Sequence, residues 1–403
     1  MSSLSPKHRE FQNPVALARL LAPLPPKLLQ QVAADFEFDK WARKITFAPY
    51  FKMHLLLSLT RYTTLSELQR ALSEDPLFAL HGAWMQVSVS ALAQLPERRG
   101  SAAFEELCSQ VLDEVAELSH APKRLRALNT ATLQSIQELL VQTQIVDSST
   151  FSLPPAVAAW AKTRENAAGF KLHLRLSGGY GGIAQVEFSP AKEHDRPHLD
   201  ALLEAAQPGD LLLFDRGYQD FGLFDQLTDR QLFFVSKLKR GVLWEVLEGK
   251  ELGEVTPSGY VVLREWKVRL GAEGSRTQHA FRLLEVLTPE GDKATLVTNR
   301  FDLTPAQVCA LYQYRWTIEI LFRWLKHTLG LSHLVSTKRE GVMIQVLMAL
   351  LVYALLVLYQ EGRERWTPKY LLLKVQFALH WTLIEYGYWL AHAQMRAAVP
   401  DFA

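Results

Sequence analysis

The spacing of apolar residues predicts helices in the first third of the chain. Apolar positions recur every three or four residues, which is the period of an amphipathic helix. The segments with this pattern are Val15–Ala22, Lys27–Phe36, Pro49–Thr60 and Ala103–Leu118. Thr64 and Glu67 have the spacing of a capping box at the start of another helix. We therefore predict a helical N-terminal domain over residues 1–135.

Two parts of this region allow a more specific interpretation. Residues 63–75 and 88–100 could belong to a helix-turn-helix-like unit that binds DNA ends, with Arg98 and Arg99 near phosphates. Any helical bundle contains such turns, so a purely structural role explains the pattern equally well. The basic run Pro122–Arg126 is typical of a solvated surface and also fits a DNA contact.

From about residue 142 the pattern changes to the alternation and short apolar runs of β-strands. The predicted strands are Gln142–Val146, Lys171–Leu176, Ile183–Ser189, Leu211–Phe214 and Leu232–Lys237. The predicted helices between them are Arg196–Ala206 and Phe221–Asp229. A hairpin followed by alternating helices and strands predicts an α/β fold with a mixed sheet, whose first part covers residues 136–239.

Residues 240–300 predict a β-rich insertion, because strand-like segments alternate with turn signals such as PSG, GAEG and PEGDK. The core is expected to resume over residues 301–360. Within it, Val342–Tyr359 is apolar but at the lower limit of length for a membrane span, contains Gln345 and is flanked by charges, so we favour a helix buried in a large core. Over residues 361–403 we expect C-terminal helices. Their aromatic side chains would belong either to the hydrophobic core or to a contact between subunits.

The clearest helix signal lies in Phe301–Leu331. Thr304 and Gln307 have capping-box spacing, and Pro305 suits the first helical position. One long helix is therefore predicted from Thr304 onward.

Four polar residues of this helix share one direction. Tyr312, Arg315, Glu319 and Lys326 are spaced by three, four and seven, so at about 100° per residue they project within a wedge of about 60°. An i,i+4 charge pair on a solvated helix would explain Arg315 and Glu319 alone. An apolar stripe lies on one side of the wedge: Leu311, Ile318, Leu321, Phe322 and Leu325. On the other side lie Trp316, Arg323 and His327.

Two aspartates follow predicted central strands. Asp147 comes after Gln142–Val146, and Asp215 comes after Leu211–Phe214. Ligand sites of open α/β sheets lie at such carboxyl ends. Each residue also has a structural explanation, because Asp147 could cap a turn and Asp215 could pair with the neighbouring Arg216.

The spacing Tyr-(2)-Arg-(3)-Glu-(6)-Lys is matched at every position from Tyr312 to Lys326. With the two aspartates in order before it, the chain resembles the insertion-sequence-four family of DDE transposases, which includes Tn-five-type enzymes. The resemblance covers residues 140 to 360 with specific motifs. It implies a ribonuclease-H-like mixed-sheet catalytic core with a β-rich insertion, preceded by a helical N-terminal domain and followed by C-terminal helices.

The resemblance also implies an activity and its partners. The chain would bind the terminal inverted repeats of an insertion sequence, cleave the ends through a hairpin intermediate, and join them to target DNA. It would act as a homodimer on paired ends, in the cytoplasm of a prokaryote and associated with the nucleoid, with no membrane partner. The competing hypotheses are an inactive or domesticated DNA-binding relative and a ribonuclease-H-like nuclease that cuts without joining.

The resemblance assigns the three carboxylates to metal binding. Asp147, Asp215 and Glu319 would hold two Mg²⁺ ions, for which Mn²⁺ can substitute. Mg²⁺ prefers carboxylate oxygen, and paired ions activate the attacking oxygen and stabilise the leaving one. The sequence offers no Cys/His ligand cluster, which is consistent with a hard-metal site.

The resemblance assigns the remaining signature residues to DNA. Tyr312, Arg315 and Lys326 would contact phosphates near the transposon end. Trp316 would help to hold an unstacked base.

Three residues outside the signature have open roles. Trp266 is the candidate for a second base-stacking ring, although Trp244 is an alternative and either ring could be core. Asp195, in the sequence His194–Asp195, is expected to order a loop at the edge of the site rather than to bind metal.

Composition adds few constraints. The 403 residues are 48% hydrophobic and 21% charged, as in soluble globular proteins. The net charge of +2 neither favours nor excludes nucleic acid, because a local basic surface does not show in the total. Two distant cysteines, Cys108 and Cys309, suggest no disulfide framework and fit a reducing cytosol.

Overall fold

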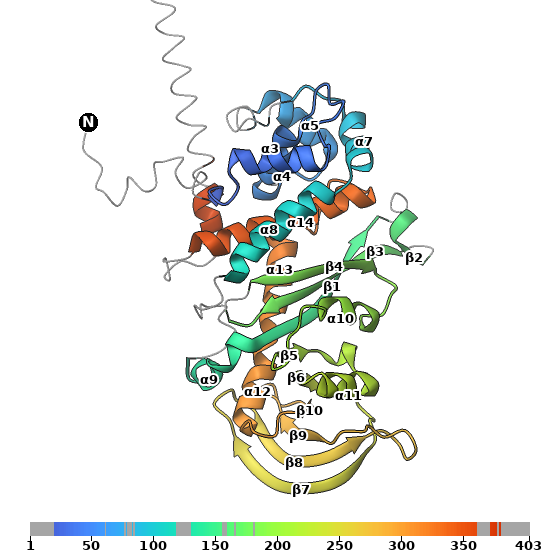
Figure 1. The fold of residues 1–403 in the computed structure, drawn as a ribbon, viewed down its shortest axis with the longest axis vertical. Helices are drawn as coiled ribbons and strands as arrows, with labels where there is room; N and C mark the ends of the chain where they lie inside the picture. Colours follow the sequence, from blue (N-terminus) through green and yellow to red (C-terminus); the bar gives the residue numbers. More distant parts are fainter. Residues whose placement is uncertain are drawn as a thin grey trace, which may run out of the picture. The chain divides into compact units, whose positions relative to one another are not determined.

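The computed structural model describes residues 20–60, 62–75, 78, 83, 85–117, 130–154, 159–164, 167–179, 182–360, 371–376 and 379. The chain divides into two compact units (Figure 1). One unit joins residues 1–112 and 156–160 to residues 325–403, and the other comprises residues 113–155 and 161–324. The predicted segment Val15–Ala22, the basic run Pro122–Arg126 and the predicted C-terminal helices lie wholly or mostly outside the described residues.

The second unit is built on a ten-stranded mixed sheet. Along the sheet the order is β2, β3, β1, β5, β6, β10, β9, β8 and β7, and β4 also pairs with β3. The first six strands in chain order are β1 (Thr143–Leu153), β2 (Lys162–Arg164), β3 (Ala167–Ser177), β4 (Ile183–Pro190), β5 (Leu211–Phe214) and β6 (Phe233–Lys237). The last four are β7 (Trp244–Val255), β8 (Val261–Leu270), β9 (Phe281–Leu287) and β10 (Lys293–Thr298).

Five of these strands have ribonuclease-H-like topology. β4, β3 and β1 form an antiparallel meander, and β1, β5 and β6 are mutually parallel neighbours. The central parallel strand, β5, is buried on both faces, which explains the continuous apolar sequence Leu211–Phe214. The predicted fold class, a mixed α/β sheet of this type with flanking helices, is therefore confirmed.

The β-rich insertion continues the same sheet. β10 pairs antiparallel with β6, and β9, β8 and β7 follow by antiparallel pairing. Figure 1 shows these four strands curling into a trough. The insertion is thus an extension of the core sheet at its β6 edge, which chain order alone did not reveal.

Five described helices accompany this sheet. They are α9 (Thr130–Ile136), α10 (Arg196–Leu202), α11 (Phe221–Asp229), α12 (Pro305–Tyr314) and α13 (Trp316–His327). Of these, α10, α11 and α12 pack against its strands, and α9 packs against α12. Short 3-10 turns occur at Leu139–Gln142, Ala159–Ala161 and Arg216–Tyr218. An apolar cluster joins α11 to the sheet through stacked rings of Phe214, Phe224 and Phe234.

The predicted single helix after Thr304 is two helices. The capping box of Thr304 and Gln307 forms, with Pro305 in the first turn. α12 ends at Tyr314, Arg315 is the junction residue, and α13 begins at Trp316. Arg315 keeps helical angles (φ −52, ψ −30), but its carbonyl accepts from the Ile318 N–H at 3.2 Å, which is a tighter i,i+3 turn. The apolar stripe is nevertheless buried as predicted.

The first unit is helical. Its described helices are α3 (Pro26–Asp35), α4 (Phe47–Leu59), α5 (Leu65–Glu74), α7 (Val89–Arg99), α8 (Ala102–Glu117) and α14 (Arg339–Gln360). The predicted capping box of Thr64 and Glu67 forms at the start of α5. Part of the segment between α5 and α7 lies outside the described residues, so the helix-turn-helix interpretation of this region stays a prediction.

The arginines assigned to phosphates in that interpretation have intrachain partners. Arg98 donates to the Gln94 side chain at 2.6 Å. Arg99 donates to the Lys40 carbonyl at 2.9 Å and lies over the Phe38 ring. Both contacts favour the structural alternative.

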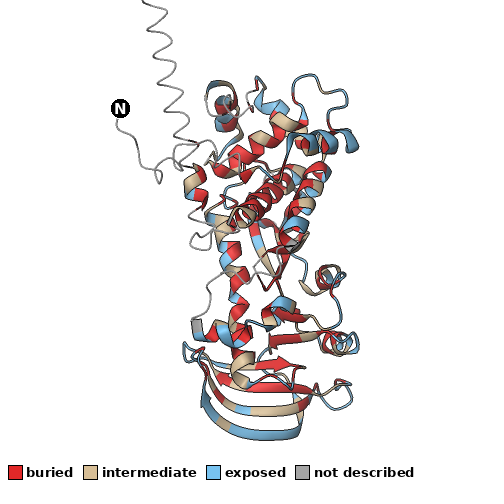
Figure 2. Ribbon diagram, turned by 60° about the vertical axis from the view of Figure 1, so that its left-hand side comes forward, coloured by how far each residue is buried: buried red, intermediate tan, exposed pale blue. Residues whose placement is uncertain are grey.

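α14 is a core helix of the first unit. It is long and apolar enough to cross a membrane, but 83% of its most apolar window is buried (Figure 2). It packs against α4 and α7, and the Glu340 carboxylate accepts from Ser101 Oγ at 2.8 Å. The prediction of a buried helix accounts for this segment.

The close contact between β7 and β8 offers a test of the sheet extension. A methyl group at Gly249 would overlap ring atoms of Trp266, which lies across from it in the register. We expect Gly249→Ala to lower the free energy of unfolding by about 1–3 kcal/mol, because the ring packs against the core and cannot withdraw freely. Urea denaturation would measure the loss. Glu254→Ala, at an exposed position of the same strand, should stay within about 0.5 kcal/mol of wild type, and equal effects of the two changes would contradict the packing.

Candidate active site

The register of β1 and β5 places two aspartates side by side. The last parallel pair is Val146 with Phe214, so Asp147 and Asp215 are the next residues on two adjacent strands. β1 does not end there, because Asp147 pairs with Leu174 of β3 and the strand runs on to Leu153. The prediction that Asp147 ends its strand is therefore wrong, and so is the alternative of a turn at this residue.

Asp215 does end its strand. It is the N-cap of the turn Arg216–Tyr218, and its Oδ1 accepts from the Gly217 N–H. Among the described residues no ion pair joins Asp215 to Arg216. The sharp turn leaves the carboxylate at the edge of the sheet next to Asp147.

Arg315 connects the third carboxylate to this edge. Its Nη1 lies 2.9 Å from Asp147 Oδ2, and its Nη2 lies 2.7 Å from Glu319 Oε1. The Arg315 side chain is 5% exposed, against 15% for Asp147 and 31% for Glu319. The expected i,i+4 pair of Arg315 and Glu319 is thus present, and the same guanidinium also binds a residue 168 positions away.

Burial makes Asp147 an unusual carboxylate. Desolvation raises its pKa to about 7, and the charges of Asp215 and Glu319 act in the same direction. The Arg315 charge and the Ser148 N–H act to lower this pKa. For Arg315, burial lowers the pKa, but the carboxylates of Asp147 and Glu319 outweigh that effect and the pKa is raised. An additional positive charge would therefore be stabilised between these carboxylates.

The carboxylates fit a hard cation only after a rearrangement. In the described part of the chain no three acidic, His or Cys side chains converge as a metal-binding group. Arg315 lies between two of the three candidate ligands. The donor set is all oxygen, and the raised pKa of Asp147 indicates that its charge is incompletely compensated. These properties suit Mg²⁺ or Mn²⁺ if the guanidinium moves aside.

A network that the sequence did not reveal supports Asp147. Ser148 donates its N–H to Asp147 Oδ1 and its Oγ to Asp195 Oδ1, each at 2.8 Å. Lys171 Nζ lies 2.9 Å from the same Asp195 oxygen. Asp195 Oδ2 also lies close to Gly217, next to Asp215. Asp195 therefore sits at the edge of the site and is held by Ser148 and Lys171.

Lys171 was not predicted as part of the site. It lies on β3 and pairs with Thr150 of β1, whereas the predicted hairpin joined Lys171–Leu176 only to Ile183–Ser189, so nothing in the sequence placed it near Asp147. His173, two residues along β3 from Lys171, is fully buried and shares a 2.8 Å hydrogen bond with Ser189. Its pKa is lowered to about 4, chiefly by burial, so it remains neutral.

The remaining signature residues lie along α12 and α13. Tyr312 is buried, and its ring lies 5.6 Å from the Arg315 guanidinium carbon. Trp316 is 46% exposed, and its ring lies 5.8 Å from the same carbon. Lys326 follows Glu319 by seven residues on α13, where partial burial lowers its pKa.

Two tryptophans of the sheet extension differ in their surroundings. Trp266 packs over Gly249 and against the apolar cluster, and its Nε1 is buried. Trp244 also touches this cluster and lines a pocket. A role in the core therefore accounts better for Trp266 than for Trp244, and which of the two rings could stack on a base stays a prediction.

The family described as transposase DDE domain matches residues 142–355, which is more than half of the chain. The chain belongs to this family, and the resemblance drawn from the signature is confirmed. It is a family of DNA transposases.

Individual relatives agree. A Geobacillus stearothermophilus protein named "Probable transposase for insertion sequence element IS5377" is 26% identical over 346 residues, covering 84% of this chain and 86% of that protein. A Sinorhizobium fredii protein named "Putative transposase y4zB" is 27% identical over 224 residues, covering 55% of this chain and 62% of that protein. The transposase for IS231D of Bacillus thuringiensis is 28% identical over 120 residues, covering 28% of this chain and 23% of that protein.

Among solved structures, the piggyBac transposase synaptic complex with hairpin DNA aligns with a TM-score of 0.45 and 9% identity. The alignment covers 98% of this chain and 84% of that one. A likeness at this level adds nothing to the description of the site.

The bridge made by Arg315 offers a test that requires no DNA. In EDTA, Arg315→Ala should lower the free energy of unfolding by about 3 kcal/mol, because it leaves the Asp147 charge buried without a partner. The loss should be larger at pH 8 than at pH 5. Asp147 holds its proton to a higher pH in the folded chain than in the unfolded chain, so its ionisation costs stability as the pH rises through about 7.

A double variant measures the contribution of the Asp147–Arg315 ion pair separately from the contributions of the two single side chains. Asp147→Asn/Arg315→Ala removes both charges and should be more stable than Arg315→Ala alone at pH 8. Arg264→Ala, which breaks an exposed ion pair, serves as the control and should cost no more than about 1 kcal/mol. Equal losses in the single and double variants would contradict a buried Asp147–Arg315 interaction.

Proposed function

We propose that this chain is a transposase that cleaves the ends of an insertion sequence and joins them to target DNA by metal-dependent phosphodiester chemistry. The observation that supports this most strongly is the pairing of β1 with β5. It brings Asp147 and Asp215 together at one edge of the sheet, and Arg315 links Glu319 to them. The order and types of these residues are those of the family signature.

Each residue of the site has a role in this proposal. Asp147, Asp215 and Glu319 hold the metal, and two Mg²⁺ ions would activate the attacking oxygen and stabilise the leaving one. Ser148 fixes the Asp147 carboxylate through its N–H, and Asp195 in turn holds the Ser148 hydroxyl. These contacts keep Asp147 in one orientation in which its second oxygen, Oδ2, faces Arg315.

DNA binding falls to the two signature helices. Phosphates would replace the carboxylates as partners of Arg315, because a guanidinium binds either group through paired N–H donors. Tyr312 orients Arg315 from one side, while Trp316 is exposed enough to stack on an unpaired base. Lys326 adds a further phosphate contact on the same helix.

The finer features of the proposal come from the family resemblance. They are a hairpin intermediate, recognition of terminal inverted repeats, a homodimer on paired ends, and a cytoplasmic location near the nucleoid. An inactive DNA-binding relative is the second candidate, because the carboxylates are already neutralised in part by Arg315 without any metal.

Cleavage of a labelled duplex tests the proposal directly. The duplex carries the terminal repeat that flanks the gene, and wild type is compared with Asp215→Ala in Mg²⁺ and in EDTA. We expect nicking that requires Mg²⁺ and falls by at least about a thousandfold in the variant. A hairpin-sized product on a denaturing gel would support the hairpin pathway, whereas equal binding without cleavage by both proteins would favour the inactive relative.

Lys326 gives a separate prediction for DNA binding. Lys326→Ala should weaken binding of the terminal repeat and reduce the slope of log K against log salt by about one, because one phosphate contact is lost. Fluorescence anisotropy at several salt concentrations would measure both. Arg323→Ala removes the same charge from the other side of α13 and is the control. An unchanged slope in Lys326→Ala, or an equal change in both variants, would contradict the assigned face.

A further inference from the structure

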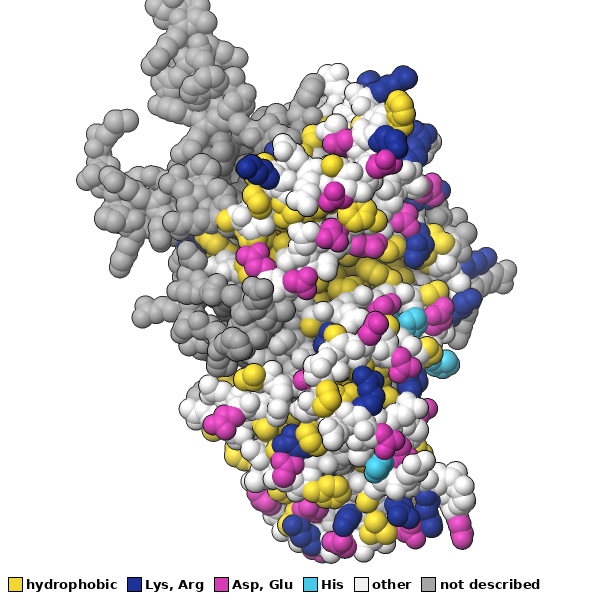
Figure 3. Space-filling model, in the orientation of Figure 1, with side chains coloured by type: hydrophobic (Ala, Val, Ile, Leu, Met, Phe, Trp, Pro, Cys, Tyr) yellow, Lys and Arg dark blue, Asp and Glu magenta, His cyan; other side chains and the backbone are white. Residues whose placement is uncertain are grey.

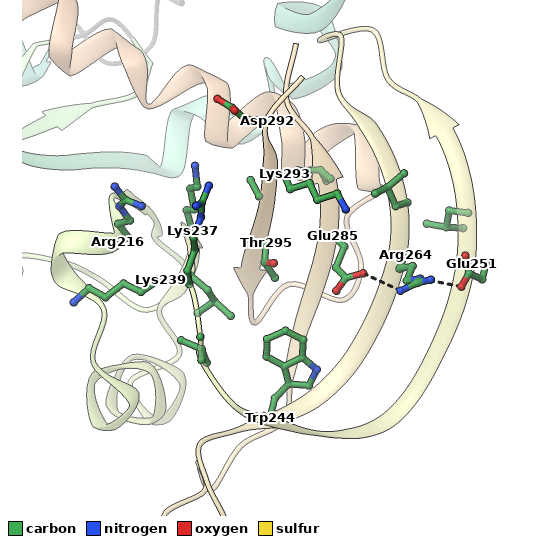
Figure 4. A pocket seen from close by; sticks show the side chains of 18 of the residues that line it. Arg216, Lys237, Lys239, Trp244, Glu251, Arg264, Glu285, Asp292, Lys293 and Thr295 are labelled. Carbon is green, nitrogen blue, oxygen red and sulfur yellow. Dashed lines mark hydrogen bonds and ion pairs between the residues drawn. The ribbon is translucent and has the colours of Figure 1, made fainter. Parts of the chain in front are cut away.

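A large pocket opens inside the trough of the sheet extension. Its volume is about 1200 Å³, and its walls come from the end of β6, from the loop that follows β6, and from β7 to β10. Figure 4 shows Arg216, Lys237 and Lys239 along one side and the Glu251–Arg264–Glu285 row along the other, with Trp244 at one end. None of these residues belongs to the family signature.

The pocket concentrates positive charge. Its lining contains three acidic residues, Glu251, Glu285 and Asp292, and six cationic ones, Arg216, Lys237, Lys239, Arg240, Arg264 and Lys293. The excess of three positive charges exceeds the net charge of +2 of the whole chain. The surface seen in Figure 3 differs, because acidic and basic side chains are interspersed over the sheet extension. A local basic surface therefore exists that the total charge conceals.

Two of the three acidic residues in the pocket share one arginine as their partner. Glu251, Arg264 and Glu285 are direct neighbours across β7, β8 and β9. Arg264 Nε lies 2.9 Å from Glu251, and its Nη1 lies 3.7 Å from Glu285. No ion pair within 4 Å joins the other five cations to any described residue. Those five are available to an anionic ligand.

The pocket lining reaches the residue that follows Asp215. Arg216 lines it and directly follows Asp215 in the sharp turn at the end of β5. In the proposed function, Tyr312, Arg315 and Trp316 hold the transposon end from α12 and α13. Joining requires a second DNA at the same carboxylates, and its phosphates need a cationic surface of their own.

We propose that this pocket binds the sugar-phosphate backbone of the target DNA that receives the transposon end. The inference rests on the proposed function. Its cations would pair with successive phosphates, and Arg216 would bring the strand to Asp215. The chemistry recognised is a polyanionic backbone, so the binding should not depend on base sequence.

The inference can be tested by measuring how a double variant of the pocket binds random-sequence DNA and how it joins a cleaved end to a plasmid. Lys239→Ala/Lys293→Ala removes two exposed charges from different sides of the pocket. We expect affinity for a random-sequence duplex, measured by anisotropy with the end site saturated by terminal-repeat DNA, to fall about tenfold or more. Joining of a pre-cleaved end to a plasmid should fall by a similar factor, and far more than cleavage of an uncut end. Lys237→Ala should act in the same direction and provides an independent variant.

The control is Lys267→Ala/Arg269→Ala, which removes two charges from β8 outside the pocket and should leave random-duplex binding within about twofold. If the pocket variants bind random duplex like wild type, the inference is overturned. If they lose terminal-repeat binding equally, the pocket holds the transposon end and the inference is again wrong. If wild type neither cleaves nor joins while the pocket variants still lose random-duplex binding, the proposed chemistry fails and the DNA site stands.

Discussion

The parallel pairing of β1 with β5 is the constraint on which the candidate active site depends. Pairing stops at Val146 and Phe214, and the next residue on each strand is an aspartate. A slip of one residue would turn every side chain of β5 to the opposite face. Leu211–Phe214 are apolar and buried on both faces, and in the observed register they place Asp215 directly beyond the end of the pairing, next to Asp147. Packing of the core thus positions the chemistry at its edge.

Arg315 extends this constraint to the helices. A buried guanidinium is stable here because Asp147 and Glu319 share its charge, and a buried Asp147 is tolerated because Arg315 faces it. The junction between α12 and α13 falls at this residue, where the turn tightens. One side chain therefore joins the signature helix to the sheet and also occupies the space between two candidate metal ligands. Under the proposed function, a metal bound by Asp147 and Glu319 would have to displace Arg315 from between them.

The sequence predicted the parts of this site but not how they contact each other. Local patterns identified Leu211–Phe214 as a strand and Phe221–Asp229 as a helix with the observed bounds, since both carry strong apolar signals. They could not show that Asp147 lies within a longer strand, because β1 continues through the polar run Ser148–Thr150, where it pairs with β3. The network of Ser148, Asp195 and Lys171 was missed for the same reason, as its members lie far apart in sequence and meet only across strands.

The sheet extension, β7 to β10, shows why the order of strands along the chain did not predict their order in the sheet. Alternating segments after residue 240 predicted strands, and strands formed, but nothing local stated that β10 would return to pair with β6. With that pairing, β7 to β10 form a trough beside the core strands. Arg216, which follows β5, and Lys237, at the end of β6, line this trough. The net charge of +2 does not reveal this, because the lining holds six cationic side chains and only three acidic ones, and Arg264 pairs with two of the acidic ones, Glu251 and Glu285. The long-range pairing of strands, rather than composition, is what concentrates positive charge beside Asp215.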